Sequence, residues 1–204
     1  VNTIAHRTVT VIKADTGSGK STQTPQYVID ACDSIAAAMR RTHTRSIADL
    51  AAPVAGERSL VGLHLPVEMV RLWGHEKALI FVTQPRRIAA VSVAKRVAEE
   101  RREALGETVG YRIGQDSAVS SGTRISFVTT GWLLQVLVHA TNRAVTTSVS
   151  STGDRTKDAE GLNGITHIVL DEVHERGLDT GLVCLVVKLA IARGFALRLG
   201  DAEA

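Results

Sequence analysis

The stretch Ala14–Ser21, with the sequence ADTGSGKS, decides the fold class of this 204-residue chain. It ends in Gly19-Lys20-Ser21, as phosphate-binding loops of the pattern G-x-x-x-x-G-K-S/T do. Ala14 stands where that pattern has its first glycine, which is compatible with such a loop when the residue closes a strand instead of forming the turn. The stretch therefore predicts a loop that binds the phosphates of a nucleotide.

The residues on either side of this loop favour that function over a chance Gly/Ser/Lys turn. Residues 8–14 are rich in β-branched side chains and predict a strand, and residues 20–31 predict a helix in spite of Pro25. A strand before the loop and a helix after it form the context in which this pattern binds phosphate.

Each residue type in the loop suits phosphate chemistry. Gly17 and Gly19 allow the backbone to wrap around the phosphates with its N–H groups pointing inward. The following helix presents the positive end of its dipole. Lys20 is expected to reach the β- and γ-phosphates, and Ser21 to bind Mg²⁺ through its hydroxyl group. The loop thus predicts a bound nucleoside triphosphate with Mg²⁺.

Further strands and helices alternate along the chain. Strands are predicted at residues 78–82, 108–112, 124–128 and 165–170, and helices at 87–103, 131–139 and 178–192. The expected buried side of helix 87–103 consists of Ile88, Val91, Ala94, Val97 and Ala98. This alternation predicts an α/β fold with a mostly parallel sheet flanked by helices on both faces, and ligands at the carboxyl ends of its strands.

Two stretches interrupt the alternation, and we interpret them as surface insertions into a single domain that spans residues 1–204. The first covers about 33–76 and contains an amphipathic part at 60–73 that either packs on the domain or binds a partner. The second covers about 140–164 and is dominated by Ser, Thr, Asp and Gly, a composition typical of disorder.

The composition limits the class of protein. Apolar side chains make up 44% of the chain and aromatic ones 3%, which suits an aliphatic core and argues against base recognition on an aromatic platform. The net charge of +3 and the pI of about 9.1 are compatible with a nucleic-acid partner but do not require one. Cys32 and Cys184 lack metal-ligand spacing and are expected to be reduced thiols. With no signal peptide and no apolar run of the roughly 20 residues that cross a membrane, we expect an intracellular protein, in the nucleus or the cytoplasm.

An acidic motif follows the last predicted strand. Asp171 and Glu172 come directly after the apolar run 165–170, at the end of a strand, where ligands of parallel sheets lie. Asp171 is expected to hold Mg²⁺, often through water, and Glu172 to orient or deprotonate the attacking water. The competing interpretation is a solvated charged turn that caps the next helix, and the presence of the phosphate loop favours the catalytic one.

Five motifs, in this order, resemble those of the DEAH-box (DEAH/RHA) RNA helicases of superfamily 2. They are the phosphate loop with its continuation at Thr16–Tyr27, TQPRR at Thr83–Arg87, VGYR at Val109–Arg112, VTTG with two leucines at Val128–Leu134, and DEVHER at Asp171–Arg176. Val173 replaces the alanine of the DEAH motif, and Thr130 replaces the aspartate of a Thr-Asp-Gly motif. The match covers most of the chain outside the two insertions.

The resemblance implies the first RecA-like domain of an ATP-dependent RNA helicase, which is a P-loop NTPase domain. It assigns binding of ATP or another NTP to Thr16, Gly17, Ser18, Gly19, Lys20, Ser21 and Thr22. It assigns catalysis to Lys20, Asp171, Glu172 and His174, with Ser21 and Asp171 at Mg²⁺. His174 is expected to link the nucleotide site to the rest of the motor. The backbone of single-stranded RNA is assigned to Arg86, Arg87, Thr129 and Gly131, with DNA left open as a substrate.

The family pattern continues beyond the end of this chain. The Ser-Ala-Thr motif expected after residue 192 does not appear, and neither does a second RecA-like domain with its arginine fingers. Because such a finger contributes roughly 10³–10⁵ in rate, we expect weak or no hydrolysis by these residues alone. We interpret them as an incomplete first motor domain of a longer helicase, which acts with its second domain and with protein cofactors. The alternative is a nucleotide-binding module without hydrolysis that serves as a switch or a partner platform.

Overall fold

The computed structural model describes residues 9–15, 17–41, 78–146, 165–175 and 177–192. The chain divides into two compact units, residues 1–78 and 79–204, and each is described by itself. In the first unit, the phosphate-loop segment leads into helix α2 (Lys20–Arg41), which contains Pro25. No helix in the described ranges is both long enough and apolar enough to cross a membrane.

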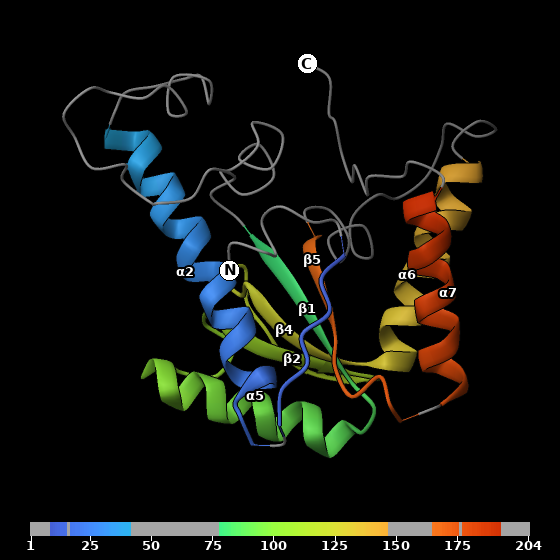
Figure 1. The fold of residues 1–204 in the computed structure, drawn as a ribbon, viewed down its shortest axis with the longest axis horizontal. Helices are drawn as coiled ribbons and strands as arrows, with labels where there is room; N and C mark the ends of the chain where they lie inside the picture. Colours follow the sequence, from blue (N-terminus) through green and yellow to red (C-terminus); the bar gives the residue numbers. More distant parts are fainter. Residues whose placement is uncertain (1–8, 16, 42–77, 147–164, 176, 193–204) are drawn as a thin grey trace. The chain divides into compact units, whose positions relative to one another are not determined.

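The second unit is built on a five-stranded sheet with the strand order β3-β2-β4-β1-β5 (Figure 1). Its strands are β1 (Leu79–Gln84), β2 (Val109–Ile113), β3 (Asp116–Ala118), β4 (Ile125–Thr129) and β5 (Ile165–Leu170). All neighbouring pairs are parallel except β2–β3, which form an antiparallel hairpin. The carboxyl ends of β1, β4 and β5 therefore lie at one edge of the sheet.

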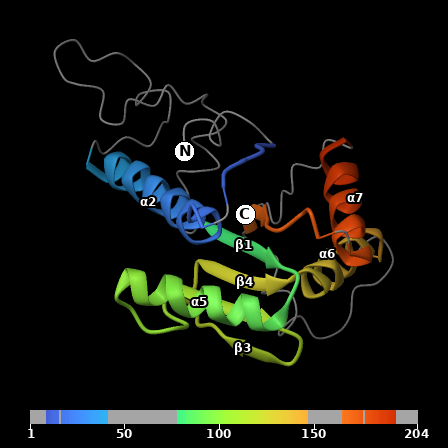
Figure 2. The ribbon, with the colours of Figure 1, turned by 60° about the horizontal axis from the view of Figure 1, so that its bottom comes forward.

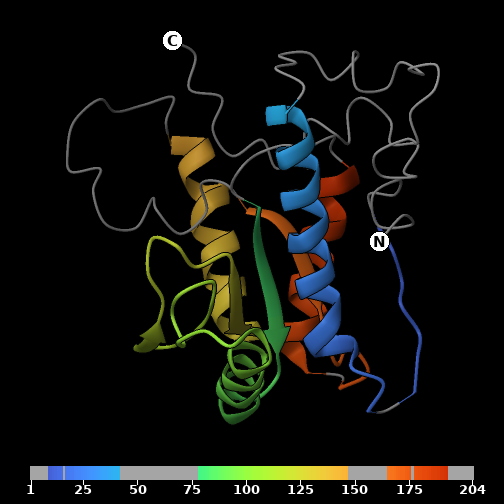
Figure 3. The same cartoon turned by 90° about the vertical axis from the view of Figure 1, so that its left-hand side faces the viewer.

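Three helices cover the two faces of this sheet. They are α5 (Arg87–Arg101), α6 (Thr130–Thr146) and α7 (Leu178–Ala192). The chain crosses from β1 through α5 to β2 in one direction, and leaves β4 through α6 in the other, so right-handed connections put the two helices on opposite faces. Figure 2 shows α5 along β4 on one face, and Figure 3 shows α6 on the far side of the strands from α5. Helix α7 packs beside α6.

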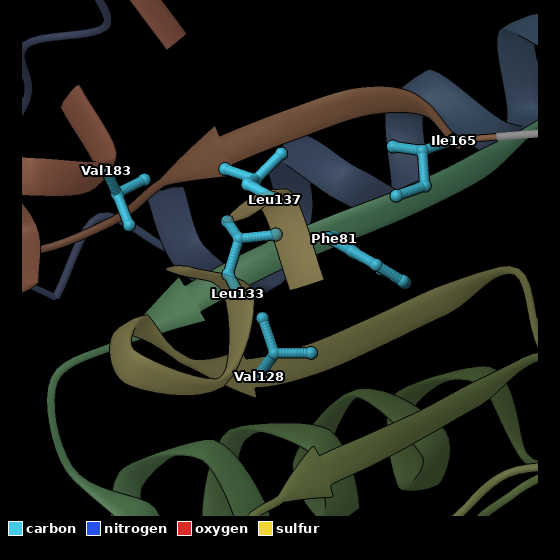
Figure 4. Packing of buried hydrophobic residues seen from close by; sticks show 6 residues of the cluster. All are labelled: Phe81, Val128, Leu133, Leu137, Ile165 and Val183. Carbon is cyan, nitrogen blue, oxygen red and sulfur yellow. The ribbon is translucent and has the colours of Figure 1, made fainter. Parts of the chain in front are cut away.

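The core between the sheet and the pair α6–α7 is aliphatic with one central ring. Phe81 and Val128 point from β1 and β4 to the same face because they lie two residues apart in the register of these strands. The buried side chains that meet there are Phe81, Val128, Leu133, Leu137, Ile165 and Val183 (Figure 4). Each fully buried side chain of this size contributes roughly 1.5–3 kcal/mol, so the cluster holds both helices firmly on the sheet.

A β-bulge sets the register at the start of β5. Leu79 faces Ile165, but Ile80 faces His167, so Thr166 is the extra residue. Its hydroxyl group lies 3.1 Å from both the N and the O atoms of Leu79 and takes the place of a regular backbone rung. Beyond the bulge the register continues without a break to Thr83 opposite Leu170, so β1 and β5 end level with each other.

The predicted α/β class, with a mostly parallel sheet and helices on both faces, is confirmed. The strand at residues 165–170 and the helix at residues 178–192 are found with the predicted bounds, the helix predicted at 87–103 ends two residues earlier, and the other predicted elements of the second unit are shifted or extended. Helix α2 runs on to Arg41 and α6 to Thr146, so the beginnings of both predicted insertions are helical. Residues 42–76 and 147–164, including the amphipathic part at 60–73, lie outside the described residues.

Three details differ from the predictions. Residues 9–15 form no strand, and Val9 and Val11 are 61% and 89% exposed, because β-branched residues favour a strand only where a neighbouring strand pairs with them. Strand β3 was not predicted, since three residues carry too little pattern. Ile88 is 81% exposed, because it lies about 200° around α5 from the buried Ala90.

Neither cysteine takes part in a disulfide within the described part of the chain. Cys32 is buried in α2, as expected for a core thiol, and Cys184 is partly exposed on α7.

A close approach of two backbones makes Gly110 necessary in β2. A Cβ atom there would collide with the carbonyl oxygen of Ala118 in β3 and would lie 3.0 Å from the side chain of Val119. We expect Gly110→Ala to lower the free energy of unfolding by about 1–3 kcal/mol, as overpacking does. Gly122→Ala is the matched control, since its Cβ would meet other atoms only at 3.6 Å or more. Equal effects of the two substitutions in urea unfolding would contradict this account of β2.

The partly buried side chain of His167 on β5 should make the stability of the fold depend on pH. Burial lowers the pKa of His167 from 6.5 to about 4. The unfolded chain therefore takes up a proton between these pH values that the folded chain does not, and the free energy of unfolding should fall as the pH drops from 6.5 to 4, by at most about 3 kcal/mol. Urea unfolding over this range should show a weaker pH dependence for His167→Gln. His139→Gln, which changes an exposed histidine of α6, should behave like the wild type.

Candidate functional site

The phosphate-loop segment of the first unit turns through two glycines in left-handed backbone conformations. Gly17 and Gly19 have φ angles of +80° and +81°. The Ser18 N–H group donates to the Asp15 carbonyl oxygen at 3.2 Å, and that of Gln23 donates to the Gly19 carbonyl oxygen at 2.7 Å as α2 begins. The predicted loop and the helix after it are therefore present, whereas the strand predicted before it is not.

The side chain of Lys20 folds back onto this loop. Its Nζ atom donates to the carbonyl oxygens of Ala14 and Asp15, both at 2.7 Å, and lies 3.5 Å from Oγ of Ser18. These acceptors are neutral groups, and among the residues that the structure describes no carboxylate forms an ion pair with the Lys20 ammonium group. Such a charge beside the amino end of a helix can attract an anion.

The other predicted nucleotide-binding residues lie on the loop or the first turn of α2. Ser18 is exposed, Ser21 and Thr22 are partly exposed, and Thr16 lies outside the described residues. The Thr22 hydroxyl group donates to the Gly19 carbonyl oxygen at 3.2 Å and supports the turn.

In the second unit, the segment after β5 is bound to the end of β1. The Gln84 side-chain amide donates to Oδ2 of Asp171 at 2.6 Å, and the Asp171 N–H group donates to Oγ1 of Thr83 at 3.2 Å. Both Thr83 and Gln84 are buried, at 2% and 4% exposed. Asp171 is thereby held at the carboxyl edge of the sheet, where a ligand of a parallel sheet is expected.

Glu172 makes the sharp turn that follows. Its φ angle is +50°, a conformation that costs a residue with a side chain about 1 kcal/mol or more. Its N–H group donates to Oδ1 of Asp171 at 3.0 Å, and its carbonyl oxygen accepts from the Glu175 N–H group at 2.9 Å. The Glu172 carboxylate is 3.3 Å from Nε2 of His174, with both side chains largely exposed. The predicted catalytic residues Asp171, Glu172 and His174 are thus neighbours on one turn.

Arg86 joins the same turn through an ion pair. Its guanidinium group donates to Oε1 of Glu175 at 3.1 Å, and the side chains are 76% and 39% exposed. An exposed pair of this kind contributes less than about 1 kcal/mol, so Arg86 can exchange this partner for another anion at little cost.

The other predicted nucleic-acid residues line a depression beside this turn. The depression has a volume of about 420 Å³ and is open to solvent. Its lining residues are Pro85, Arg87, Gly114, Thr129, Gly131, Trp132, Leu134, Gln135 and Asp179. Arg87, Thr129 and Gly131 are thus brought together from the ends of β1 and β4, while Arg86 is not part of this lining.

Thr130, where the family pattern has aspartate, is buried and lies between these segments. Its hydroxyl group donates to the Gln84 carbonyl oxygen at 3.4 Å. The hydroxyl thus connects the start of α6 to the end of β1 without a carboxylate.

Sequence reasoning missed three residues of this region. Gln84 lies inside the TQPRR motif but carried no predicted role. Trp132 follows the VTTG motif, and its ring packs edge-on against Phe81 with centroids 5.5 Å apart. Asp179, in the first turn of α7, comes so close to Gly131 that a Cβ atom there would lie 3.0 Å from its carboxylate. Motif spacing alone signals none of these contacts, because each joins separate elements.

Two predicted metal ligands, each considered by itself, carry donor atoms that suit Mg²⁺. Asp171 contributes carboxylate oxygens and Ser21 a hydroxyl oxygen, which are hard ligands. Within the described ranges, no group of three or more His, Cys, Asp or Glu side chains could hold a metal ion. Because Mg²⁺ commonly uses one or two protein oxygens together with water and phosphate, either residue by itself offers a donor that suits an ion that arrives with a nucleotide.

Comparison with known proteins identifies similar sequences over nearly the whole chain. The protein DHX57 of Mus musculus is 39% identical over 180 residues, which are 88% of this chain and 9% of DHX57. The DExH-box ATP-dependent RNA helicase DExH3 of Arabidopsis thaliana is 33% identical over 196 residues, which are 96% of this chain and 12% of DExH3. The DExH-box ATP-dependent RNA helicase DExH1 of the same plant is 30% identical over 199 residues, which are 98% of this chain and 14% of DExH1. The chain therefore spans about a tenth of the length of these relatives.

The crystal structure of the Escherichia coli DEAH/RHA helicase HrpB matches 64% of this chain and 14% of its own, with 30% identity and a TM-score of 0.46. No family model matches the chain. The resemblance indicated by the five motifs is confirmed by the relatives: over nearly its whole length, this chain is similar to one segment of the DExH/DEAH-box RNA helicases.

Proposed function

We propose that this chain provides the NTP·Mg²⁺ site and part of the single-stranded RNA backbone site of an ATP-dependent RNA helicase of the DEAH-box type. One observation carries the proposal. Within the second unit, the segments with the predicted nucleic-acid residues and with Asp171, Glu172 and His174 meet at the carboxyl ends of β1, β4 and β5, and Gln84 is hydrogen-bonded to both Asp171 and Thr130. The names of the Arabidopsis relatives support the same activity for a longer protein.

In the proposed nucleotide site, the loop residues Thr16–Thr22 surround the phosphates. Lys20, whose Nζ atom donates to the carbonyl oxygens of Ala14 and Asp15, would exchange these acceptors for the β- and γ-phosphates. Ser21 and Asp171 would hold Mg²⁺, which neutralises phosphate charge when it is bound.

The acidic turn would supply the proton chemistry of hydrolysis. Glu172 orients the attacking water and accepts its proton, and its largely exposed carboxylate is accessible for this role. His174, 3.3 Å from that carboxylate, would pass the state of the nucleotide site on to other parts of the motor.

RNA would bind through its backbone. Arg87 can donate to phosphate oxygens from the wall of the depression, whose lining also includes Thr129 and Gly131, and Arg86 can leave Glu175 for the next phosphate. An intracellular location and protein cofactors follow from this function and belong to the same proposal.

The hydrolysis of NTP by the complete protein tests the proposal. Lys20→Ala and Glu172→Gln should each lower RNA-stimulated hydrolysis by at least about 100-fold, since one removes a phosphate ligand and the other a general base. Lys95→Ala and Glu99→Gln, which change exposed side chains of α5, are the matched controls and should retain the wild-type rate.

The binding of nucleotide separates the outcomes of this experiment. Glu172→Gln should still bind NTP, whereas Lys20→Ala should bind it more weakly. Tight binding without any RNA-stimulated hydrolysis by the wild type would instead support the non-hydrolysing module. Unchanged hydrolysis in both variants would refute the assignment of this site.

The salt dependence of RNA binding tests the backbone site. Fluorescence anisotropy with a labelled oligouridine should show an affinity that falls linearly with salt on logarithmic axes, by about 0.7 per neutralised phosphate. Arg87→Ala should lower the magnitude of this slope by about 0.7, the contribution of one phosphate contact. Arg96→Ala, on the exposed side of α5, should leave the slope unchanged. Binding that does not respond to salt would argue against phosphate contacts, and oligothymidine in the same assay decides between RNA and DNA.

A further inference from the structure

Gln84 is a buried polar residue to which neither the motifs nor the proposed mechanism gives a role. It lies at the end of β1 with 4% of its surface exposed. Its side-chain amide donates to Oδ2 of Asp171 at 2.6 Å, across 87 positions of the sequence. A hydrogen bond to a charged acceptor in a buried place is short and strong, and leaving either partner without it is costly.

The bonds around Gln84 connect three segments of the chain. Its side chain binds the acidic turn, and its carbonyl oxygen accepts from the Thr130 hydroxyl group at 3.4 Å. The preceding residue, Thr83, accepts from the Asp171 N–H group at 3.2 Å. Side chains at the end of β1 therefore bind both the carboxylate and the backbone N–H group of Asp171, the candidate metal ligand.

This arrangement determines which lone pairs of Asp171 remain available. Gln84 occupies one acceptor position on Oδ2, and the Glu172 N–H group occupies one on Oδ1. A carboxylate oxygen has two such positions, so among the described residues each oxygen keeps one for a cation or for a water molecule bound to it. The amide thus fixes the rotation of the carboxylate as well as its place.

We propose that Gln84 is a positioning residue: it orients the Asp171 carboxylate for Mg²⁺ and makes that orientation depend on the segment Thr83–Arg87, which carries the RNA candidates. The inference rests on the proposed function in one respect, namely that Asp171 holds the metal. Outer hydrogen-bond partners of metal ligands commonly contribute 10- to 100-fold in metal affinity.

The affinity for Mg²⁺ is the first measurement. In the complete protein, Mg²⁺ is titrated into a constant concentration of a fluorescent ATP analogue, and Gln84→Leu should require at least about tenfold more Mg²⁺ for half-maximal binding. Gln115→Leu is the matched control, since it makes the same change at an exposed turn and should match the wild type.

A double-mutant cycle measures the bond without any metal. Urea unfolding of Gln84→Leu, Asp171→Ala and the double variant should be non-additive by at least about fivefold in the unfolding constant, because the two side chains act as one pair. The exchanged pair Gln84→Glu with Asp171→Asn reverses donor and acceptor. It should recover the stability that Gln84→Glu alone loses, and should not recover the affinity for Mg²⁺.

The outcomes are distinct. A folded Gln84→Leu protein with wild-type Mg²⁺ dependence would overturn the positioning role, as would additive effects in the cycle. Failure of the wild type to bind NTP with Mg²⁺ would refute the proposed function, and would also remove the metal from the inference. The positioning role of Gln84 is supported if Gln84→Leu weakens Mg²⁺ binding, the double-mutant cycle is non-additive and Gln115→Leu has no effect.

Discussion

The pairing of β1 with β4 on one side and β5 on the other is the constraint on which the second unit depends. Without it, residues from three distant parts of the chain would have no reason to meet. Because all three strands are parallel and end level, the groups that follow them gather at one edge. The bulge at Thr166 is part of this constraint, since it sets the register that puts Thr83 opposite Leu170.

The elements with strong local patterns were predictable, and the others were not. Residues 165–170 form an apolar run that an acidic turn ends, so the bounds of β5 followed from the sequence. The lengths of α2 and α6 were underestimated, because polar and small residues can extend a helix that is already packed at its other end. For the β-branched residues 9–14, by contrast, a strand was predicted and none is found, since strand propensity does not supply a pairing partner.

The sequence allowed candidate site residues to be named, but not the contacts between them. Motif order identified Asp171, Arg87 and Gly131, because each residue type is tied to a chemical task. The amide that orients Asp171 was invisible, since Gln84 and Asp171 are 87 positions apart and nothing local connects them. The bond from the Thr130 hydroxyl group to the end of β1 was equally invisible, because the motif shows only that a threonine stands in the place of an aspartate.

Trp132 gives the depression an optical property of its own. Its ring lies edge-on against Phe81 and 5.9 Å from the guanidinium carbon of Arg112, so its emission depends on charges and contacts within a few ångströms. The chain contains two tryptophans, and the other one, Trp73, lies outside the described residues. Replacing Trp73 by phenylalanine would leave Trp132, at the wall of the depression, as the one tryptophan of this 204-residue sequence, and its emission can be excited selectively over that of the two tyrosines. The occupancy of this surface could then be followed in real time without a label on either molecule.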